Sequence, residues 1–467
     1  MTTSRTIMVS LAGAACLIAM LYLTLSSDDA SRHVIFATWG TPAEVNSFRR
    51  LVDHFNATRH PAHPVRLSHA EQSSYIERLF VMGAARSMPD VMHLDRKDLP
   101  LFVHRGLVED LTPFIASDTA FSLSDFLPAL IPGCGVNGTI YGIPHNFSTL
   151  VLYYNRDHFD AAGLSSPDST WTWDSLRIAA QRLTRTNAAG AITRYGCYLN
   201  IIVQTLISQN GGSILNASLD SCIVASPEAE GAIRFMIDMS EQYHATWNTL
   251  AQDLLWDEMF IGGRCSMVAT GRWAAAAYVA AMHPGSVGVA PLPRGRFRHG
   301  AAVNHMMVMS SESTKKQDAW AFITFLASDE AQRMVNDDGA NIPARRSIVL
   351  SDAFLHHRLT PTMNNRVFLD ELPTSVGWPF EQGPWLSGHT LQSQLDLVLR
   401  RVLLGQATIH QSLALMQARV NDAIALQRRT PHPVPFVGSV LWYLCCTGTL
   451  VATVFIVRSR IRRRHGT

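Results

Sequence analysis

Residues 136–155, VNGTIYGIPHNFSTLVLYYN, are the stretch that decides the fold. Asn137 and Gly138 form a turn signal, because both residue types tolerate a positive φ. Residues 150–154 are an apolar run of strand length, which is typical of a strand buried on both faces. The polar patch between them, at 145–149, is awkward inside a core. Two interpretations stay open: the chain crosses here from one compact unit to another across a cleft, or an ordinary hairpin precedes a core strand.

Segments on either side of this stretch alternate between strand and helix patterns. Before it, residues 34–38 (VIFAT) have the β-branched character of a strand, and Val45, Phe48 and Val52 then repeat at helical spacing. After it, the alternation restarts with a helix that begins near Thr172, a candidate N-cap. This order predicts an α/β protein with largely parallel sheets.

The composition limits the classes of function. The chain has 467 residues and a formal net charge of +2, which argues against a nucleic-acid-binding protein with a basic surface. Its length allows two or three domains. The 7 cysteines contain no CxxC pair, so no structural zinc site is predicted. Cys197 and Cys222 form either a disulfide in an oxidising compartment or two separate buried thiols.

Apolar segments at both ends predict flanking transmembrane helices. Residues 7–25, within an N-terminal segment 1–30, follow Arg5 and are interpreted as a secretory signal or an uncleaved signal anchor. Residues 436–457 carry no charge and precede a basic tail, 458–467. The positive-inside rule then places both termini in the cytoplasm, unless the N-terminal signal is cleaved, and the body of the protein outside the membrane. A buried core helix is the alternative for the second segment.

Short motifs in the body of the chain resemble those of a known family. They are PDV at 89–91, GLVEDL at 106–111, YGIP at 141–144, LYYN at 152–155, WTWD at 171–174, GRW at 271–273 and VGVAPLP at 287–293. In this order they resemble the extracellular solute-binding proteins of bacterial ABC importers, family 1, and within it the maltose-binding and glycerol-3-phosphate-binding group.

The resemblance implies a two-lobed periplasmic-binding-protein fold (type II-like) with a cleft that closes by a hinge. Lobe 1 would comprise 33–145 and 292–345, and lobe 2 would comprise 146–291 and 346–430. The implied function is capture of a carbohydrate or polyol outside the cytoplasm for import, with ABC permease subunits as partners in the membrane. The alternative, suggested by the second apolar segment, is a membrane-tethered sugar sensor with the same binding body.

Tryptophans near strand ends are the candidate aromatic contacts to a sugar. A pyranose has an apolar face that stacks on flat rings, and the loops at the carboxyl ends of strands are where α/β proteins bind ligands. Trp39 follows the first strand, Trp273 follows a strand and opens a helix, and Trp385 lies in a loop rich in glycine and proline, with Trp378 as a weaker candidate. For each ring the alternative is a role in packing.

The candidate polar contacts are Asp95, Glu44, Asn146, Ser148 and Arg345. Asp95 ends the third predicted strand and Glu44 begins a helix, whereas Asn146 and Ser148 belong to the polar patch. Each has an alternative: Glu44 stabilises the helix dipole, Asp95 pairs with Arg96 or Lys97, and Arg345 forms a surface salt bridge. The many aromatic and few cationic candidates favour a neutral sugar over a phosphate ester.

Catalytic patterns are missing from the sequence. It contains no HExxH, GxSxG or P-loop motif, and the spacing of Glu44 and Asp95 does not favour a glycosidase pair over hydroxyl binding. The prediction is therefore a binding protein that is not an enzyme and uses no cofactor.

Overall fold

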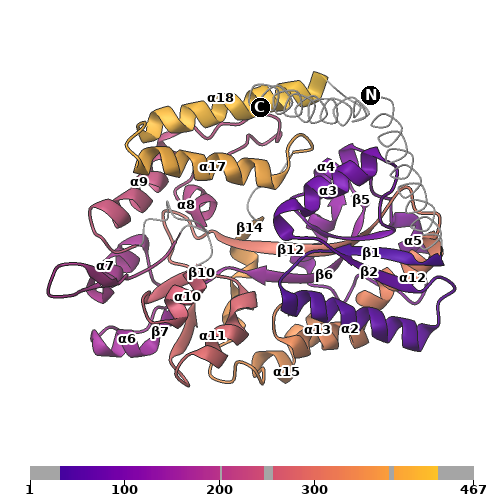
Figure 1. The fold of residues 1–467 in the computed structure, drawn as a ribbon, viewed down its shortest axis with the longest axis horizontal. Coiled ribbons are helices and arrows are strands. Elements are labelled where there is room, and N and C mark those ends of the chain that lie inside the picture. The colour runs from indigo at the N-terminus through magenta and orange to yellow at the C-terminus, as the bar shows by residue number, and fades with distance from the viewer. Residues whose placement is uncertain (1–31, 200–201, 247–255, 378–382, 430–467) are drawn as a thin grey trace, which may run out of the picture.

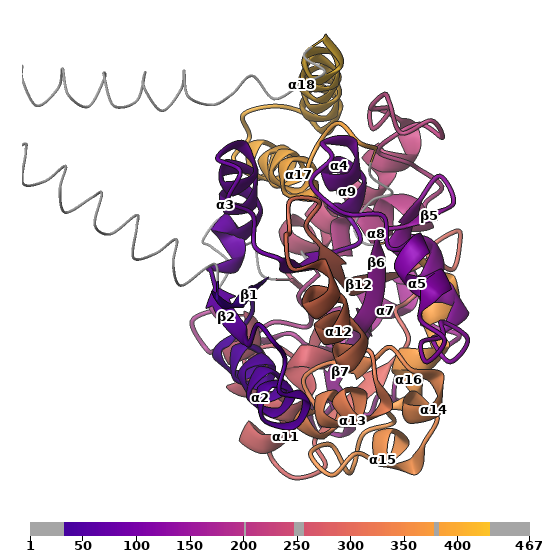
Figure 2. The same ribbon diagram turned by 90° about the vertical axis from the view of Figure 1, so that its right-hand side faces the viewer.

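The computed structural model describes residues 32–199, 202–246, 256–377 and 383–429. Its elements gather around two separate sheets, which we call lobe 1 and lobe 2. In Figure 1 strands β1 and β2 of lobe 1 lie at the right, and helices α6, α7 and α9 of lobe 2 lie at the left. Helices α17 and α18 lie at the same end as α3 and α4, and α2, α11 and α13 lie at the opposite end (Figure 2).

The predicted transmembrane flanks are corrected. A spanning helix needs about 20 consecutive apolar residues, and within the described ranges no helix is long and apolar enough. The longest of these helices, α18 (Ile409–Arg429), carries four charged residues in its second half: Arg419, Asp422, Arg428 and Arg429. The two predicted spans, 7–25 and 436–457, and the tail 458–467 lie outside the described residues. Over the residues that the structure describes, the fold is therefore a two-lobed α/β fold, and no transmembrane helix flanks it within those ranges.

Lobe 1 is built on a seven-stranded sheet. The strand order is β13-β6-β12-β3-β1-β2, and β14 pairs with β12. Strands β1, β2 and β3 are mutually parallel, whereas β12 is antiparallel to both β3 and β6. The strands are β1 (Val34–Thr38), β2 (Val65–His69), β3 (Val91–Asp95), β6 (Gly142–Thr149), β12 (Gly300–Met309), β13 (Ile342–Pro343) and β14 (Ser375–Gly377).

Helices cover both faces of this sheet. Phe36, Val91 and Met307 face α2 and α12, and Ala37, Met92 and Val308 pack with residues of α3 and α4. This division follows from the alternation of side chains along a strand. The helices of this lobe and of the segment that follows it are α2 (Pro42–Arg59), α3 (Gln72–Ala84), α4 (Leu99–His104), α5 (Thr112–Ser117), α12 (Lys316–Leu326), α13 (Asp329–Asp338), α14 (Arg346–Val349), α15 (Asp352–Leu355) and α16 (Arg366–Asp370).

Lobe 2 is built on a small antiparallel sheet. β7 (Val151–Asn155) lies between β10 (Met267–Thr270) and β11 (Val287–Ala290). Cys197 and Cys222 are both buried and free, which agrees with separate thiols rather than a disulfide. The surrounding helices are α6 (Arg156–Ala161), α7 (Trp173–Leu183), α8 (Val203–Gln209), α9 (Pro227–Glu241), α10 (Trp256–Ile261), α11 (Ala275–Ala281), α17 (Gly388–Leu403) and α18.

The stretch 136–155 carries the chain from one lobe to the other. Asn137 and Gly138 form the tip of a hairpin between β4 (Gly135–Val136) and β5 (Thr139–Ile140), with φ of 52° and 84°. β6 then pairs only within the sheet of lobe 1, and β7 only within that of lobe 2, with Leu150 alone between them. This confirms the crossing and not the alternative of a hairpin followed by a core strand. The exact lobe boundaries remain a prediction.

Candidate functional site

The carboxyl ends of β1 and β3 bring Trp39 and Asp95 to one edge of the sheet of lobe 1. The Trp39 ring stacks on the His93 ring, with centroids 4.2 Å apart, and is tilted against Tyr75 at 4.8 Å. Trp39 is only 7% exposed. Its ring therefore packs at the edge of the sheet, and only a small part of the ring is exposed to a ligand.

Asp95 is paired with Lys97, which is one of the alternatives left open by the sequence. Lys97 Nζ lies 2.8 Å from Asp95 Oδ2 and 3.2 Å from Asp98 Oδ2. Burial works to lower the pKa of Lys97, but the two aspartates more than offset burial and raise this pKa above its usual value. The lysine is thus held as a cation between two carboxylates, and its charge is not free to bind an anion.

Three histidines beneath this edge were missed by the sequence reasoning. His93 lies on β3, His145 on β6 and His305 on β12, and all three face the side of the sheet that α2 covers. The His93 and His305 ring centroids are 4.9 Å apart, and those of His93 and His145 are 6.2 Å apart. Two sequence signals bear on them: His145 begins the polar patch 145–149, and the alternation along a strand puts His93 and Asp95 on one face.

Burial keeps these rings neutral. It is the largest influence on each of them: it lowers the pKa of His145 to about 3 and holds the pKa of His93 well below 6.5. The pKa of His305 is also lowered, chiefly by burial, although the nearby Asp95 acts in the opposite direction. Nε2 of His93 and Nδ1 of His145 are buried without a hydrogen-bond partner among the described residues. A proton added to these rings would therefore be poorly accommodated.

Glu44 closes the start of α2. Its Oε2 accepts hydrogen bonds from the Thr41 backbone N–H at 2.8 Å and from Thr41 Oγ1 at 3.0 Å. The backbone N–H of Glu44 donates to Thr41 Oγ1 at 3.3 Å, which completes a capping box. Oε1 accepts from Asn341 Nδ2 at 3.3 Å. The side chain is partly exposed, so it both caps the helix and presents a carboxylate at its first turn.

The crossing residues Asn146 and Ser148 are buried. Asn146 Oδ1 lies 2.8 Å from His305 Nδ1. Ser148 Oγ accepts a hydrogen bond from the backbone N–H of Arg272 at 2.7 Å. Ser148 therefore fixes the segment that carries Trp273, and Asn146 orients the His305 ring.

Trp273 lies where the two lobes meet. It belongs to the 3-10 turn η3 (Arg272–Ala274), is partly exposed, and packs against two apolar clusters, one of which contains residues of both sheets. The preceding Arg272 is buried and donates to the Gly339 carbonyl at 2.8 Å and to Thr360 Oγ1 at 3.2 Å. These bonds tie the start of η3 to the end of α13 and fix the position of the Trp273 backbone.

Trp385 and Arg345 lie among other partners. The Trp385 ring contacts the His104 ring at 4.9 Å, and the Arg428 guanidinium lies 5.1 Å from its centroid. Arg345 donates from Nε to the Ala327 carbonyl at 2.7 Å and from Nη1 to Asp125 Oδ2 at 3.1 Å. Neither residue therefore has a recorded contact with Trp39, Asp95 or the three histidines among the described residues. Trp378 lies outside the described residues.

We expect Arg345→Ala to reduce stability without weakening ligand binding. Loss of the Asp125 ion pair and of the hydrogen bond to Ala327 should lower the free energy of unfolding by about 1–2 kcal/mol, because the pair is only partly shielded from water. Urea unfolding and calorimetric titration would measure the two effects separately. If Arg345→Ala weakened binding and left the stability unchanged, Arg345 would have to be assigned as a ligand contact.

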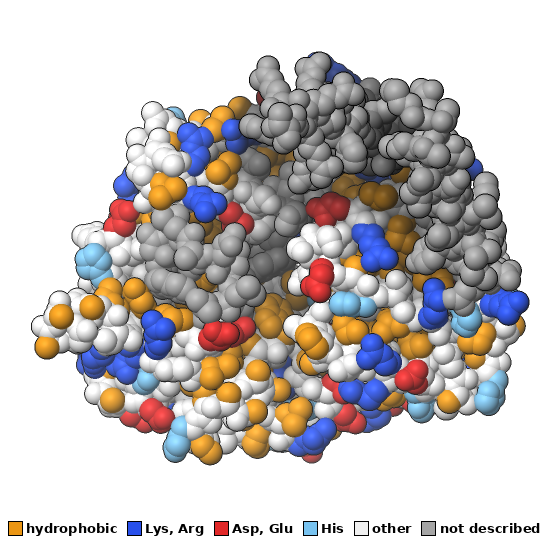
Figure 3. Space-filling view, viewed as in Figure 1, with side chains coloured by type: hydrophobic (Ala, Val, Ile, Leu, Met, Phe, Trp, Pro, Cys, Tyr) orange, Lys and Arg blue, Asp and Glu red, His pale blue; other side chains and the backbone are white. Residues whose placement is uncertain are grey.

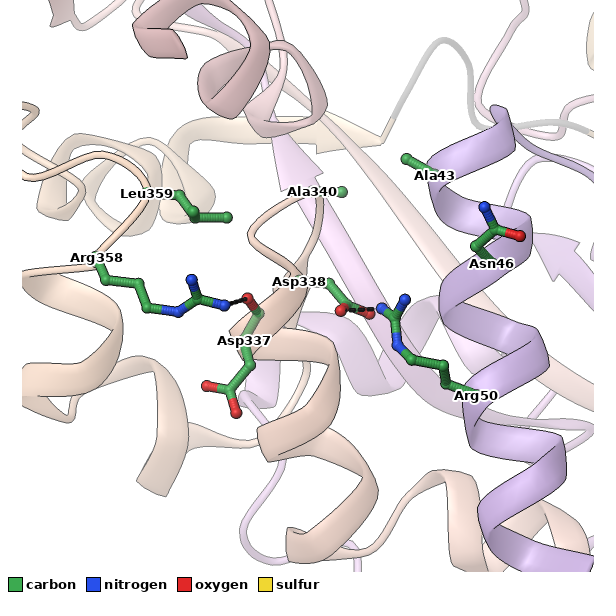
Figure 4. A pocket seen from close by; sticks show the side chains of 8 residues that line it. All are labelled: Ala43, Asn46, Arg50, Asp337, Asp338, Ala340, Arg358 and Leu359. Carbon is green, nitrogen blue, oxygen red and sulfur yellow. Dashed lines mark hydrogen bonds and ion pairs between the residues drawn. The ribbon is translucent and has the colours of Figure 1, made fainter.

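A separate pocket of about 300 Å³ lies beside α2. Figure 4 shows Arg50 reaching from α2 to Asp338, and Arg358 donating to the Asp337 carbonyl, at 3.2 Å. Both guanidinium groups are thus already engaged, and the pocket contains none of the predicted ligand contacts. Its lining residues are Ala43, Asn46, Arg50, Asp337, Asp338, Ala340, Arg358 and Leu359. The space-filling view instead shows a hollow between the two lobes, with acidic side chains on its right-hand border (Figure 3).

The two-lobed α/β fold has counterparts among known protein families. Residues 39–333, more than half of the chain, match the family of bacterial extracellular solute-binding proteins. The chain belongs to this family, which confirms the resemblance seen in the motifs. Because these are substrate-binding proteins, the family also confirms that the protein is not an enzyme.

Relatives and solved structures agree with this family. The mannitol-binding protein of Pseudomonas aeruginosa is 25% identical over 292 residues, 57% of this chain and 63% of that protein. The chain thus matches less than two thirds of that relative's length. The substrate-binding protein Lmo0181 of Listeria monocytogenes, in complex with cycloalternan, superposes with a TM-score of 0.75 at 22% identity, covering 84% of this chain and 99% of that one. Maltose-bound MalE3 of T. maritima gives 0.70 at 21% identity, covering 83% and 98%. These structures confirm the two-lobed fold.

Proposed function

We propose that the protein captures a carbohydrate or polyol outside the cytoplasm and delivers it to ABC permease subunits. The observation that carries this proposal is the family match over residues 39–333. The names of its relatives support the ligand class, since they include a mannitol-binding and a maltodextrin-binding protein. The same match favours import over the alternative of a tethered sensor.

The proposed ligand contacts are Trp273, Glu44, Trp39 and Asp95. Trp273 and Glu44 are partly exposed, and Trp39 and Asp95 lie at one edge of the sheet of lobe 1. Asn146 and Ser148 support this framework through their bonds to His305 and Arg272, whereas Arg345 and Trp385 contact other residues. Lys97 is paired with aspartates and Arg272 is buried against neutral acceptors, so neither supplies a cation free to bind an anion. This arrangement supports a neutral ligand.

A thermal-shift screen of the full chain tests the proposal. The panel is mannitol, maltose, tagatose and glycerophosphocholine, ligands of proteins with this fold or of this family. A neutral sugar or polyol at 100 times its Kd should stabilise the protein by about 2.7 kcal/mol. Stabilisation by glycerophosphocholine alone would contradict the neutral-sugar class, and no shift with any neutral member would contradict the carbohydrate proposal.

We expect Trp273→Ala to weaken binding of the best panel ligand about 10- to 100-fold. Removing a stacked ring costs about 1–3 kcal/mol of binding free energy, whereas the partly exposed position limits the loss of stability. Trp320→Ala is the matched control, because Trp320 is 6% exposed in the core of lobe 1 and donates to Asp118 at 3.0 Å. The control should lower the melting temperature and leave affinity unchanged. The reverse pattern would assign Trp273 to the core.

A further inference from the structure

His305 is the one of the three clustered histidines whose ring reaches the surface. Its side chain is 15% exposed, whereas His93 and His145 are almost fully buried. Nδ1 lies 2.8 Å from Asn146 Oδ1. Nε2 lies 4.0 Å from Asp95 Oδ2. One ring nitrogen is therefore engaged, and the other faces a carboxylate across a gap.

The gap has the size that a hydroxyl group fills. A separation of 4.0 Å is too long for a direct hydrogen bond. An oxygen placed about 2.8 Å from both atoms would make an angle of roughly 90° between them, which is compatible with two hydrogen bonds at one hydroxyl. Lys97 holds Asp95 in place from the other side, at 2.8 Å from the same Oδ2. The ring nitrogen and the carboxylate are thus held near each other without forming a direct hydrogen bond.

The surroundings fix the ring of His305. The Trp39 ring meets it edge-on at 5.5 Å, and His93 meets it at 4.9 Å. β12 pairs with β3 on one side, where His305 lies opposite Asp95, and with β6 on the other, where it lies opposite Asn146. A ring held by neighbours on both strands loses little conformational freedom when a ligand binds, which favours affinity.

We propose that His305 Nε2 and Asp95 Oδ2 together bind one hydroxyl group of the ligand. This rests on the proposed function, since it assigns a new contact within the sugar site. The hydroxyl has one proton, which it donates to the carboxylate, and Nε2–H of the neutral ring donates to the hydroxyl oxygen. In the structure the Asn146 oxygen faces Nδ1. Binding of the hydroxyl in this way requires this amide to be turned by a half-turn, so that its nitrogen donates to Nδ1 and leaves the proton of the ring on Nε2.

Two substitutions separate the roles of the ring nitrogens. The amide nitrogen of His305→Gln lies near the position of Nε2, and that of His305→Asn lies near the position of Nδ1. We therefore expect His305→Asn to bind the best panel ligand at least 10-fold more weakly, as expected for a lost hydrogen bond in a partly buried site. His305→Gln should stay within a few-fold of the unchanged protein. Calorimetric titration gives the affinities, and melting temperatures verify that both variants fold.

A double-substitution cycle with Asp95→Asn provides the second measurement. If both groups bind the same hydroxyl, the combined variant His305→Asn/Asp95→Asn should bind about as weakly as the weaker single variant, because the two losses are not independent. Additive losses in the double-substitution cycle would overturn the assignment and leave the proposed function intact. The same holds if His305→Asn and His305→Gln weaken binding equally, or if neither of these variants changes the affinity. Failure of the unchanged protein to bind any neutral panel member would overturn both.

Discussion

Acidification from pH 7.5 to pH 5.0 is expected to lower the free energy of unfolding by roughly 4 kcal/mol, through His93 and His145 alone. Both rings are buried, and their folded pKa values lie below the unfolded value of about 6.5. Above that value neither state binds the protons, and stability is full. As the pH falls below it, the unfolded chain takes up the protons and the folded protein does not. Each ring then accounts for about 2 kcal/mol at pH 5.0.

Neighbouring titratable groups act on the pKa values of the two rings in the same direction as burial. His305 and Lys97 both act to lower the pKa of His93, and His305 acts likewise on His145. Urea unfolding at a series of pH values would measure the loss of stability. His145→Phe keeps a flat ring beside Phe48, whose ring stacks on His145 at 5.3 Å, and should remove about half of the pH dependence. The exposed His356, substituted by Gln, is the matched control and should not change it. Equal stability at both pH values would contradict the prediction.

Gly196→Ala is expected to destabilise the protein by about 3 kcal/mol or more, because there is no space for a methyl group. A Cβ at this position would lie 2.0 Å from the Ala180 carbonyl oxygen and 2.5 Å from the Ala180 Cα, both in the backbone of α7. The glycine cannot move away easily. Its neighbours Tyr195 and Cys197 donate backbone hydrogen bonds to Arg264 and Ala245, each at 2.9 Å.

Gly300→Ala is the matched control for this substitution. The three atoms nearest to a Cβ there would be side-chain atoms of Glu371, Ser375 and Thr374, each at 3.2 Å, and these can shift slightly. We expect a loss well below that of Gly196→Ala, measured by the midpoint of thermal or urea unfolding. If the two variants were equally stable, the packing of α7 directly on residue 196 would be wrong.

Local sequence patterns determined the helices, strands and turns and the order in which they follow one another along the chain. Thr41 and Glu44 start α2 through their capping box, and its buried residues follow the predicted 3.6-residue repeat. The turn at Asn137-Gly138 formed because both residues adopt positive φ. The strand length of 150–154 and the polar patch before it indicated the crossing between lobes. Even Trp39 and Asp95 could be placed at one edge, because parallel strands end on the same side of a sheet.

Only the tertiary structure decided what each candidate side chain does. Whether Asp95 pairs with Lys97 or Arg345 with Asp125 depends on side-chain positions that no spacing in the sequence specifies. The histidine cluster depends on strand order: β12 enters between β3 and β6 in the antiparallel direction, with an irregular register between His305 and Met306. A strand so far along the chain can pair at many positions and in either direction, and a shift of one residue would turn His305 to the opposite face. The sequence therefore indicated where the site lies, and the pairing of β12 decided which polar groups meet there.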